Sequence, residues 1–237
     1  MLSAGDRERL RAQVQEAADV GFARFQETVR SRPELREDSG RELLAPVTRA
    51  LRVLWRVAPP GARPALGTRL AECLLLRGDA VGARALCERL LRPWRTGDRA
   101  RDRAGDRAPL LALRGFCALH AGDAGRARED FQEVVELGPP HPGSCVRALC
   151  GRGLLRVLAG SAFLGALDYV TACRLRPEEA LLVTKAYVPW NQRGLLMTVL
   201  REEGRRMLQQ RPEPGSESGP GCRSKAAETD SRAAQEG

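Results

Sequence analysis

The sequence predicts an all-α fold in which helical hairpins stack side by side as a solenoid. Residues 70–87 and 114–131 align on a Gly-Asp pair, and residues 146–176 repeat the same unit around Gly160. Glycine can end one helix in the left-handed conformation and aspartate can cap the next, so the unit predicts a helix, a turn and a helix. Repetition of one such unit along a chain is the sequence signature of a solenoid.

The composition supports a packed protein and disfavours several other classes. Hydrophobic residues make up 43% of the 237 residues, which is enough to build a core. Aromatic residues are only 4%, which argues against an RNA-binding sheet that stacks bases on aromatic side chains. No apolar run approaches the roughly 18 residues of a membrane span, and the N-terminus lacks the apolar stretch of a signal peptide. We therefore expect a soluble, intracellular protein of the cytoplasm that does not bind membranes.

Two helices are predicted before the first full hairpin. Residues 6–30 have a helical pattern with the offsets of a second helix, so the chain is expected to start within a partial repeat over residues 1–33. The residues that match these offsets are Gly21, Phe25, Thr28 and Pro33. Residues 41–57 place apolar side chains three and four positions apart, which predicts an amphipathic helix. Pro59-Pro60-Gly61 is expected to end it.

Three full hairpins are predicted near residues 66–92, 108–138 and 146–176. Each has a small residue in its first helix and, in its second, a small residue four positions before a larger one. The two helices of a hairpin cross closely, so small side chains are needed at the contact and the larger ring fills the space between hairpins. A proline then ends the second helix because it lacks an N–H group. These residues are Ala71, Gly115 and Gly153, then Ala83 with Cys87, Ala127 with Phe131 and Gly165 with Tyr169, and finally Pro139 and Pro177.

This pattern resembles the tetratricopeptide repeat family. The family repeat is a helical hairpin of about 34 residues with a small residue in its first helix, Ala-x-x-x-Phe in its second helix and a terminal proline. The small residues of the first helices recur here at positions 71, 115, 153 and 194, which is a longer spacing. Longer loops between the hairpins are therefore expected. The resemblance implies a TPR-like solenoid that acts as a protein-interaction scaffold.

The longest insertion covers residues 92–108 and contains Asp-Arg-Ala three times. Its period of four would allow Asp–Arg pairing on a helix, whereas Gly97 and Gly105 favour a solvated loop.

The C-terminal part of the chain predicts one more helix and a tail. Trp190-Asn191-Gln192-Arg193-Gly194 resembles the start of another first helix, so a partial repeat is expected over residues 188–210. It completes a repeat domain over residues 1–210. Residues 211–237 are rich in Pro, Gly, Ser, Glu and Ala, which predicts a disordered tail.

The sequence contains no pattern that predicts catalysis, a cofactor or a metal site. The seven cysteines are odd in number and form no tight framework, so buried, reduced thiols are expected. His141, Cys145 and Cys150 lack the Cys-x-x-Cys spacing and the fourth ligand of a zinc site. A P-loop is absent because neither lysine follows a glycine-rich loop. We predict that the protein is not an enzyme and uses no catalytic residue, cofactor or metal.

The resemblance implies a partner-binding groove on the concave face formed by the first helices. Its positions follow each small residue and lie one turn to either side, and its expected ligand is a peptide or helix of an unidentified protein. Some of these side chains could instead pack against neighbouring hairpins, and His120 could line the groove or act as a helix-end cation. The expected groove residues are Thr68, Glu72, Leu75, Ala112, Phe116, Leu119, Cys150, Leu154, Val157, Asn191 and Leu195.

A chaperone carboxylate clamp, which some members of the family form, is not expected in this groove. Such a clamp needs asparagine directly after the small residue of the first helix. This chain has Glu72, Phe116, Leu154 and Leu195 at those positions, so an apolar ligand fits better.

The formal net charge of +9 suggests an alternative, an arginine-driven binder of nucleic acid or acidic protein surfaces. Only two of the 39 basic residues are lysines, Lys185 and Lys225, so the excess is almost all arginine. In the densest run, aspartates alternate with arginines, which undercuts a phosphate-binding strip; the arginines are Arg99, Arg101, Arg103 and Arg107, and the aspartates are Asp98, Asp102 and Asp106. A solvated charged surface is the simpler interpretation, and nucleic acid is the less favoured partner.

Overall fold

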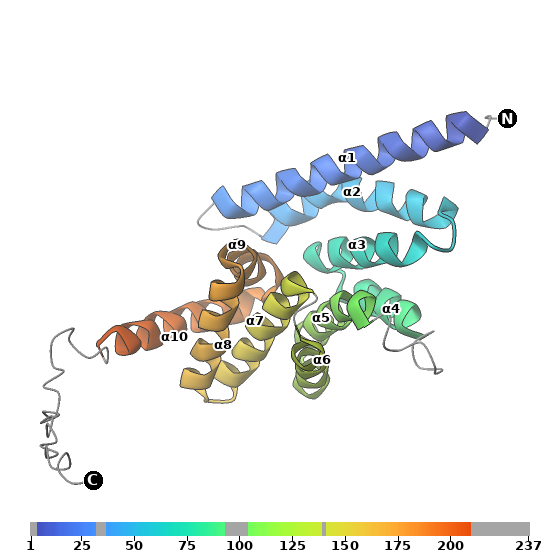
Figure 1. Cartoon of the computed structure of the whole chain (residues 1–237). Coiled ribbons are helices and arrows are strands. Elements are labelled where there is room, and N and C mark those ends of the chain that lie inside the picture. Colours follow the sequence, from blue (N-terminus) through green and yellow to red (C-terminus); the bar gives the residue numbers. More distant parts are fainter. Residues whose placement is uncertain (1–3, 32–36, 93–103, 139–140, 210–237) are drawn as a thin grey trace, which may run out of the picture.

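The computed structural model describes residues 4–31, 37–92, 104–138 and 141–209 (Figure 1). Throughout these residues the regular structure is helical, which confirms the predicted all-α class built from stacked hairpins. Residues 93–103 of the insertion and the predicted tail of residues 211–237 lie outside the described part of the chain. In chain order the helices are α1 (Ala4–Ser31), α2 (Glu37–Val57), α3 (Arg63–Leu76), α4 (Ala80–Leu91), α5 (Ala104–His120), α6 (Ala124–Leu137), α7 (Pro142–Leu158), α8 (Ala162–Leu175), α9 (Pro177–Leu182), the π-helical turn η2 (Val183–Tyr187) and α10 (Trp190–Gln209).

The helices pair in order along the chain, α1 with α2, α3 with α4, α5 with α6 and α7 with α8. The second helix of each of the first three pairs also packs against the first helix of the next pair. The first helices α3, α5 and α7 contact one another in turn. In Figure 1 the pairs follow one another from α1 and α2 at the top, through α5 and α6 below, to α7 and α8, and α8 leads up to α9 beneath α1. The array therefore curls far enough for α9 to contact α1.

Helix α1 differs from its expected place in the repeat. Its offsets predict the second helix of a partial repeat, whereas the structure pairs it with α2 as the first helix of a hairpin. Gly21 lies at this crossing, because a Cβ atom there would come within 2.5 Å of Val47 Cγ2. Phe25 is buried in the same interface, at 1% exposure. The small-and-aromatic pattern thus marks a close helix crossing without fixing which helix is the partner.

The turns within the hairpins follow from the glycine and aspartate pattern. Gly78 and Gly122 have φ angles of 85° and 77°, in the left-handed region that glycine adopts without strain. The next residue caps the second helix: Asp79 Oδ1 accepts from Gly82 N at 2.8 Å, and Asp123 Oδ1 accepts from Arg126 N at 3.0 Å. The third turn has the glycine but places Ser161 at the cap, where its side chain makes no capping hydrogen bond.

The helix crossings depend on glycines that face one aromatic ring. A Cβ atom at Gly115 would lie 2.6 Å from Phe131 Cε1, and one at Gly151 would lie 2.3 Å from Phe131 Cζ. The ring of Phe131 on α6 therefore sits between α5 and α7, which is the place that the repeat pattern gives to the aromatic residue. In α10, by contrast, a Cβ atom at Gly194 would meet no described atom within 4 Å, so none of the described helices crosses there.

Candidate partner-binding site

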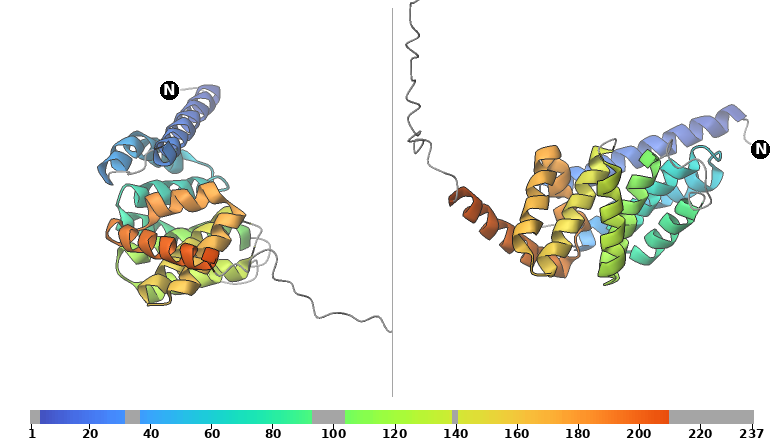
Figure 2. Two further views of the ribbon diagram at one scale, coloured as in Figure 1. Left: turned by 90° about the vertical axis from the view of Figure 1, so that its left-hand side faces the viewer. Right: turned by 60° about the horizontal axis from the view of Figure 1, so that its bottom comes forward.

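The inner side of the array is lined by the first helices and crossed by a later segment of the chain. We call this segment, residues 177–188, the clasp; it comprises α9, η2 and Val188. Its α9 part packs against α1 and α7, and its η2 part contacts α3 and α7. Figures 1 and 2 show α9 near the C-terminal end of α1, where the two ends of the array meet. The site is therefore built from four helices and a segment of the same chain.

Tyr187 anchors the clasp, and its side chain is fully buried. Its hydroxyl donates a hydrogen bond to the Glu72 carboxylate on α3. Its ring centroid lies 5.4 Å from that of Phe116 on α5, and the guanidinium of Arg147 on α7 lies 5.1 Å from the ring centre. His120 Nε2 is 2.9 Å from the carbonyl oxygen of the same tyrosine. One residue of the clasp thus contacts all three first helices.

Two ion pairs surround this tyrosine. An Arg147 side-chain nitrogen lies 2.9 Å from Glu72 Oε1, and its Nε donates to Glu179 Oε1 of the clasp at 2.8 Å. Burial acts to lower the pKa of Arg147, but Glu72, Tyr187 and Glu179 more than offset this and raise it. Burial raises the pKa of Tyr187 well above its usual value; Arg147 opposes the rise and Glu72 adds to it. The phenol is therefore neutral and acts as a hydrogen-bond donor to the carboxylate.

Lys185 connects the clasp to the N-terminal hairpin formed by α1 and α2. Lys185 Nζ donates to the backbone carbonyls of Val29 and Arg30 at 3.1 and 3.3 Å. These carbonyls belong to the last turn of α1, where free acceptors and the helix dipole favour a cation. An exposed ion pair of 3.5 Å joins Arg30 to Glu178 beside it. The clasp consequently links the first hairpin to the inner face of the other three.

The expected groove residues divide into two groups in the structure. Eight of them are buried within the chain: Glu72, Leu75, Ala112, Phe116, Leu119, Cys150, Leu154 and Val157. Thr68 is half-buried, and Asn191 and Leu195 are exposed on α10. The site brings Glu72 and Phe116 together around Tyr187, so this part of the expected groove is filled by the clasp.

Sequence reasoning missed the clasp residues Tyr187, Lys185 and Glu179 and their partner Arg147. Tyr187 is one of two tyrosines in the chain and Lys185 is one of two lysines, so their rarity was the available signal. Tyr187 lies 115 positions from Glu72 in the sequence, and no periodic pattern connects them.

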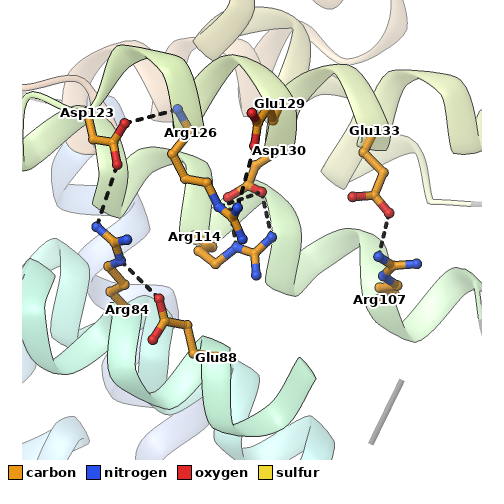
Figure 3. A network of polar contacts seen from close by, with 9 residues as sticks. All are labelled: Arg84, Glu88, Arg107, Arg114, Asp123, Arg126, Glu129, Asp130 and Glu133. Carbon is orange, nitrogen blue, oxygen red and sulfur yellow. Dashed lines mark hydrogen bonds and ion pairs between the residues drawn. The ribbon is translucent and has the colours of Figure 1, made fainter. Parts of the chain in front are cut away.

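Arginine–carboxylate pairs lie inside the hairpins as well as on their surface (Figure 3). Arg114 donates to both carboxylate oxygens of Asp130, at 2.8 and 2.6 Å, and both side chains are buried. Arg152 and Asp168 form the same pair one hairpin later, at 3.0 and 2.7 Å. The surrounding surface pairs are Arg84 with Glu88 and Asp123, Arg107 with Glu133 and Arg126 with Glu129. This part of the surface is thus locally neutralised, which disfavours it as a phosphate-binding strip.

The thiols of the described residues are poor candidates for nucleophiles. Burial raises the pKa of Cys73 and of Cys117 to about 12, so both are protonated near neutral pH. No group of three or more potential metal ligands occurs among the residues with described positions. No helix in the described part of the chain is long and apolar enough to cross a membrane.

Comparison with known proteins gives one distant match. No family model and no curated protein matches the chain. Among solved structures it is similar to a tetratricopeptide repeat protein from Parabacteroides merdae ATCC 43184, with 16% identity over 80% of this chain and 68% of that chain. The TM-score is 0.41, so the assignment to the class of helical-hairpin solenoids rests on the helix packing described above. Residues 186–196 also resemble the end of tetratricopeptide repeat protein 34, and the comparisons give this closer resemblance no support.

Proposed function

We propose that the protein is a non-catalytic, TPR-like interaction scaffold that binds a peptide or helix of another protein through its inner face. The observation that carries this proposal is the clasp itself. A short segment lies on α3, α5 and α7 and is held by the buried aromatic side chain of Tyr187, by the Arg147–Glu179 ion pair and by the hydrogen bond from Tyr187 to Glu72. A face that holds one short helical segment in this way has the chemistry to hold another.

The proposed compartment is the cytoplasm. The six cysteines in the described part of the chain are free thiols, and four of them are buried. Free thiols persist where the cell keeps its proteins reduced.

A site-specific photo-crosslinker tests the proposed surface. Thr68 and Thr171 are matched positions, because each threonine hydroxyl donates to the carbonyl four residues earlier at 2.9 Å. Thr68 lies one turn before Glu72 on the inner side of α3, whereas Thr171 is exposed on α8. We expect benzoylphenylalanine at position 68 to capture partner proteins in cells and the same group at position 171 to capture none of them. Capture from position 171 alone would place the binding surface elsewhere.

One face of α2 supports the alternative, an arginine-driven binder of acidic surfaces. Arg49, Arg52 and Arg56 recur at helical spacing and are exposed, and they form no ion pair with the carboxylates of the described residues. Affinity for an acidic partner at this face would fall steeply with salt, since binding there releases counterions. Replacing all three with glutamine should remove the salt dependence; a partner whose affinity stays the same in this variant and at high salt excludes the alternative.

A further inference from the structure

We propose that the clasp is a displaceable internal ligand, and that the partner of the inner face is a short helix of the same chemistry. That helix would carry a carboxylate for Arg147 and, eight residues later, a tyrosine for Glu72, as Glu179 and Tyr187 do in the clasp. This inference rests on the proposed function, because it names the ligand and the regulation of the same face.

The inner face is built so that it can lose the clasp without stranding a buried charge. Glu72 and Arg147 contact each other at 2.9 Å as well as the clasp, and they bridge α3 and α7. A buried charge without a partner is strongly destabilising, whereas a charge that keeps its partner is tolerated. When Tyr187 and Glu179 leave, the remaining ion pair still neutralises both groups. The face left behind is an apolar surface around Phe116 with one fixed donor and one fixed acceptor.

The clasp has the backbone features of a separate, movable unit. It follows one extended residue, Arg176 with φ −155° and ψ 94°, and ends at another, Val188 with φ −67° and ψ 132°. Between them, η2 is a π-helical turn, a rare conformation that is frequent at functional sites. Residues at the ends of helices are the usual hinges, because they absorb changes in φ and ψ.

The helix that follows the clasp is only partly covered by the rest of the described chain. An apolar cavity of about 320 Å³ lies between α8 and α10, lined by residues that include Tyr169, Cys173 and Leu200. Trp190 and Leu195 of α10 are 53% and 49% exposed, so much of this helix has no protein cover. Segments with few buried apolar contacts open at the low end of the stability range of a protein.

The contacts of the clasp specify the partner chemistry. The hydroxyl of the tyrosine must donate to Glu72, and its ring must fit between Phe116 and the Arg147 guanidinium. A basic residue two positions before the tyrosine would bind the free carbonyls at the end of α1, as Lys185 does. A phenylalanine in place of the tyrosine would leave the Glu72 carboxylate without that donor, and this selects a tyrosine-bearing helix over a merely apolar one.

A synthetic peptide of residues 177–189 with a fluorescent label is the probe for this proposal. Binding is measured on the full chain, in the wild type and in the Tyr187→Ala variant, which frees the face from its anchor. The attached clasp competes at an effective concentration in the millimolar range. We therefore expect the peptide to bind the variant at least tenfold more tightly than the wild type. A peptide with alanine at the tyrosine position is the matched control and should bind neither protein.

The results of this binding experiment distinguish a failure of the displaceable-clasp proposal from a failure of the proposed function. Equal affinity of the peptide for both proteins would show that the clasp does not compete with the peptide, and would overturn this proposal. It would not contradict binding of a partner at the inner face. A folded variant whose clasp amides exchange freely but which binds no peptide would refute the proposed function itself.

Amide hydrogen exchange of the wild-type protein tests the proposal without the Tyr187→Ala variant, and therefore also applies if that variant fails to fold. Amides of residues 183–188 should exchange at least tenfold faster than those of residues 111–118 in α5, because a displaceable segment opens locally. Equal exchange rates would mean that the clasp opens only when the whole protein unfolds, and would overturn the proposal.

Discussion

At the scale of single residues, the buried Arg114–Asp130 pair is the most informative feature, because another hairpin of the same chain has apolar residues at the aligned positions. In the first hairpin the aligned positions are Leu70 and Leu86, and both are buried at 3% and 8% exposure. The same hairpin interior therefore accepts either a charged pair or two leucines. This indicates that the ion pair is exchangeable as a unit, whereas loss of one partner is not tolerated.

We expect Asp130→Leu to lower the free energy of unfolding by about 3–5 kcal/mol, because it leaves the Arg114 guanidinium buried without its partner. The double variant Arg114→Leu/Asp130→Leu should lose less than half as much. Urea denaturation followed by circular dichroism measures both. A double variant less stable than the single one would contradict this view of the hairpin interior.

Two glycines offer a second matched test at this scale. Gly151→Ala drives a methyl group into the ring of Phe131, so we expect a loss of about 1–3 kcal/mol from overpacking. Gly194→Ala meets nothing and should stabilise the protein by up to about 1 kcal/mol, the helix propensity gained. Thermal unfolding of the two variants should shift in opposite directions, and a neutral Gly151→Ala would show that no close crossing exists there.

At the scale of the helices, the cap of each second helix is set locally. Asp123 caps α6 with its side chain, whereas Ser161 does not cap α8. We expect Asp123→Ala to cost about 0.5–2 kcal/mol and Ser161→Ala to cost almost nothing. Equal losses in urea denaturation would show that the capping hydrogen bond is not what distinguishes the two turns.

The sequence predicted the features of the helices that depend on near neighbours. The Gly-Asp turns and the place of Gly115 opposite Phe131 follow from spacing within one hairpin, whereas Gly151, on the next hairpin, was not predicted. The pairing of α1 with α2 could not be derived, because a small residue shows that a helix crosses without showing which one. The contacts of the clasp could not be predicted from the sequence for a similar reason. Lys185 and Val29 are 156 positions apart, and only the curvature of the whole array brings them together.

At the scale of the whole molecule, the buried thiols predict how stability depends on pH. Burial raises the pKa of Cys73 and Cys117 from 9.0 to about 12, so both remain neutral in the folded protein while the unfolded chain ionises. A raised pKa gives stability that is complete below pH 9 and is lost as the pH rises from 9 toward 12. The loss should be about 1 kcal/mol per thiol for each pH unit in this window.

Urea denaturation under reducing conditions between pH 8 and 11 measures this dependence. The double variant Cys73→Ala/Cys117→Ala is the control; it should be less stable at pH 8 and should lose stability less steeply above pH 9. An unchanged slope would show that these thiols ionise as readily in the folded protein as in the unfolded chain.

The clasp makes the molecule a nearly closed ring rather than an open array. Lys185 reports this closure well, because it is half-buried with its Nζ on the α1 carbonyls and because the chain has only one other lysine. The central claim is that the clasp occupies the inner face of the native protein. The most direct test is the rate at which an amine-specific acetylating reagent modifies Lys185, read by mass spectrometry, in the native protein and in the free peptide of residues 177–189. A rate at least tenfold slower in the native protein is the predicted result, and equal rates would contradict the claim.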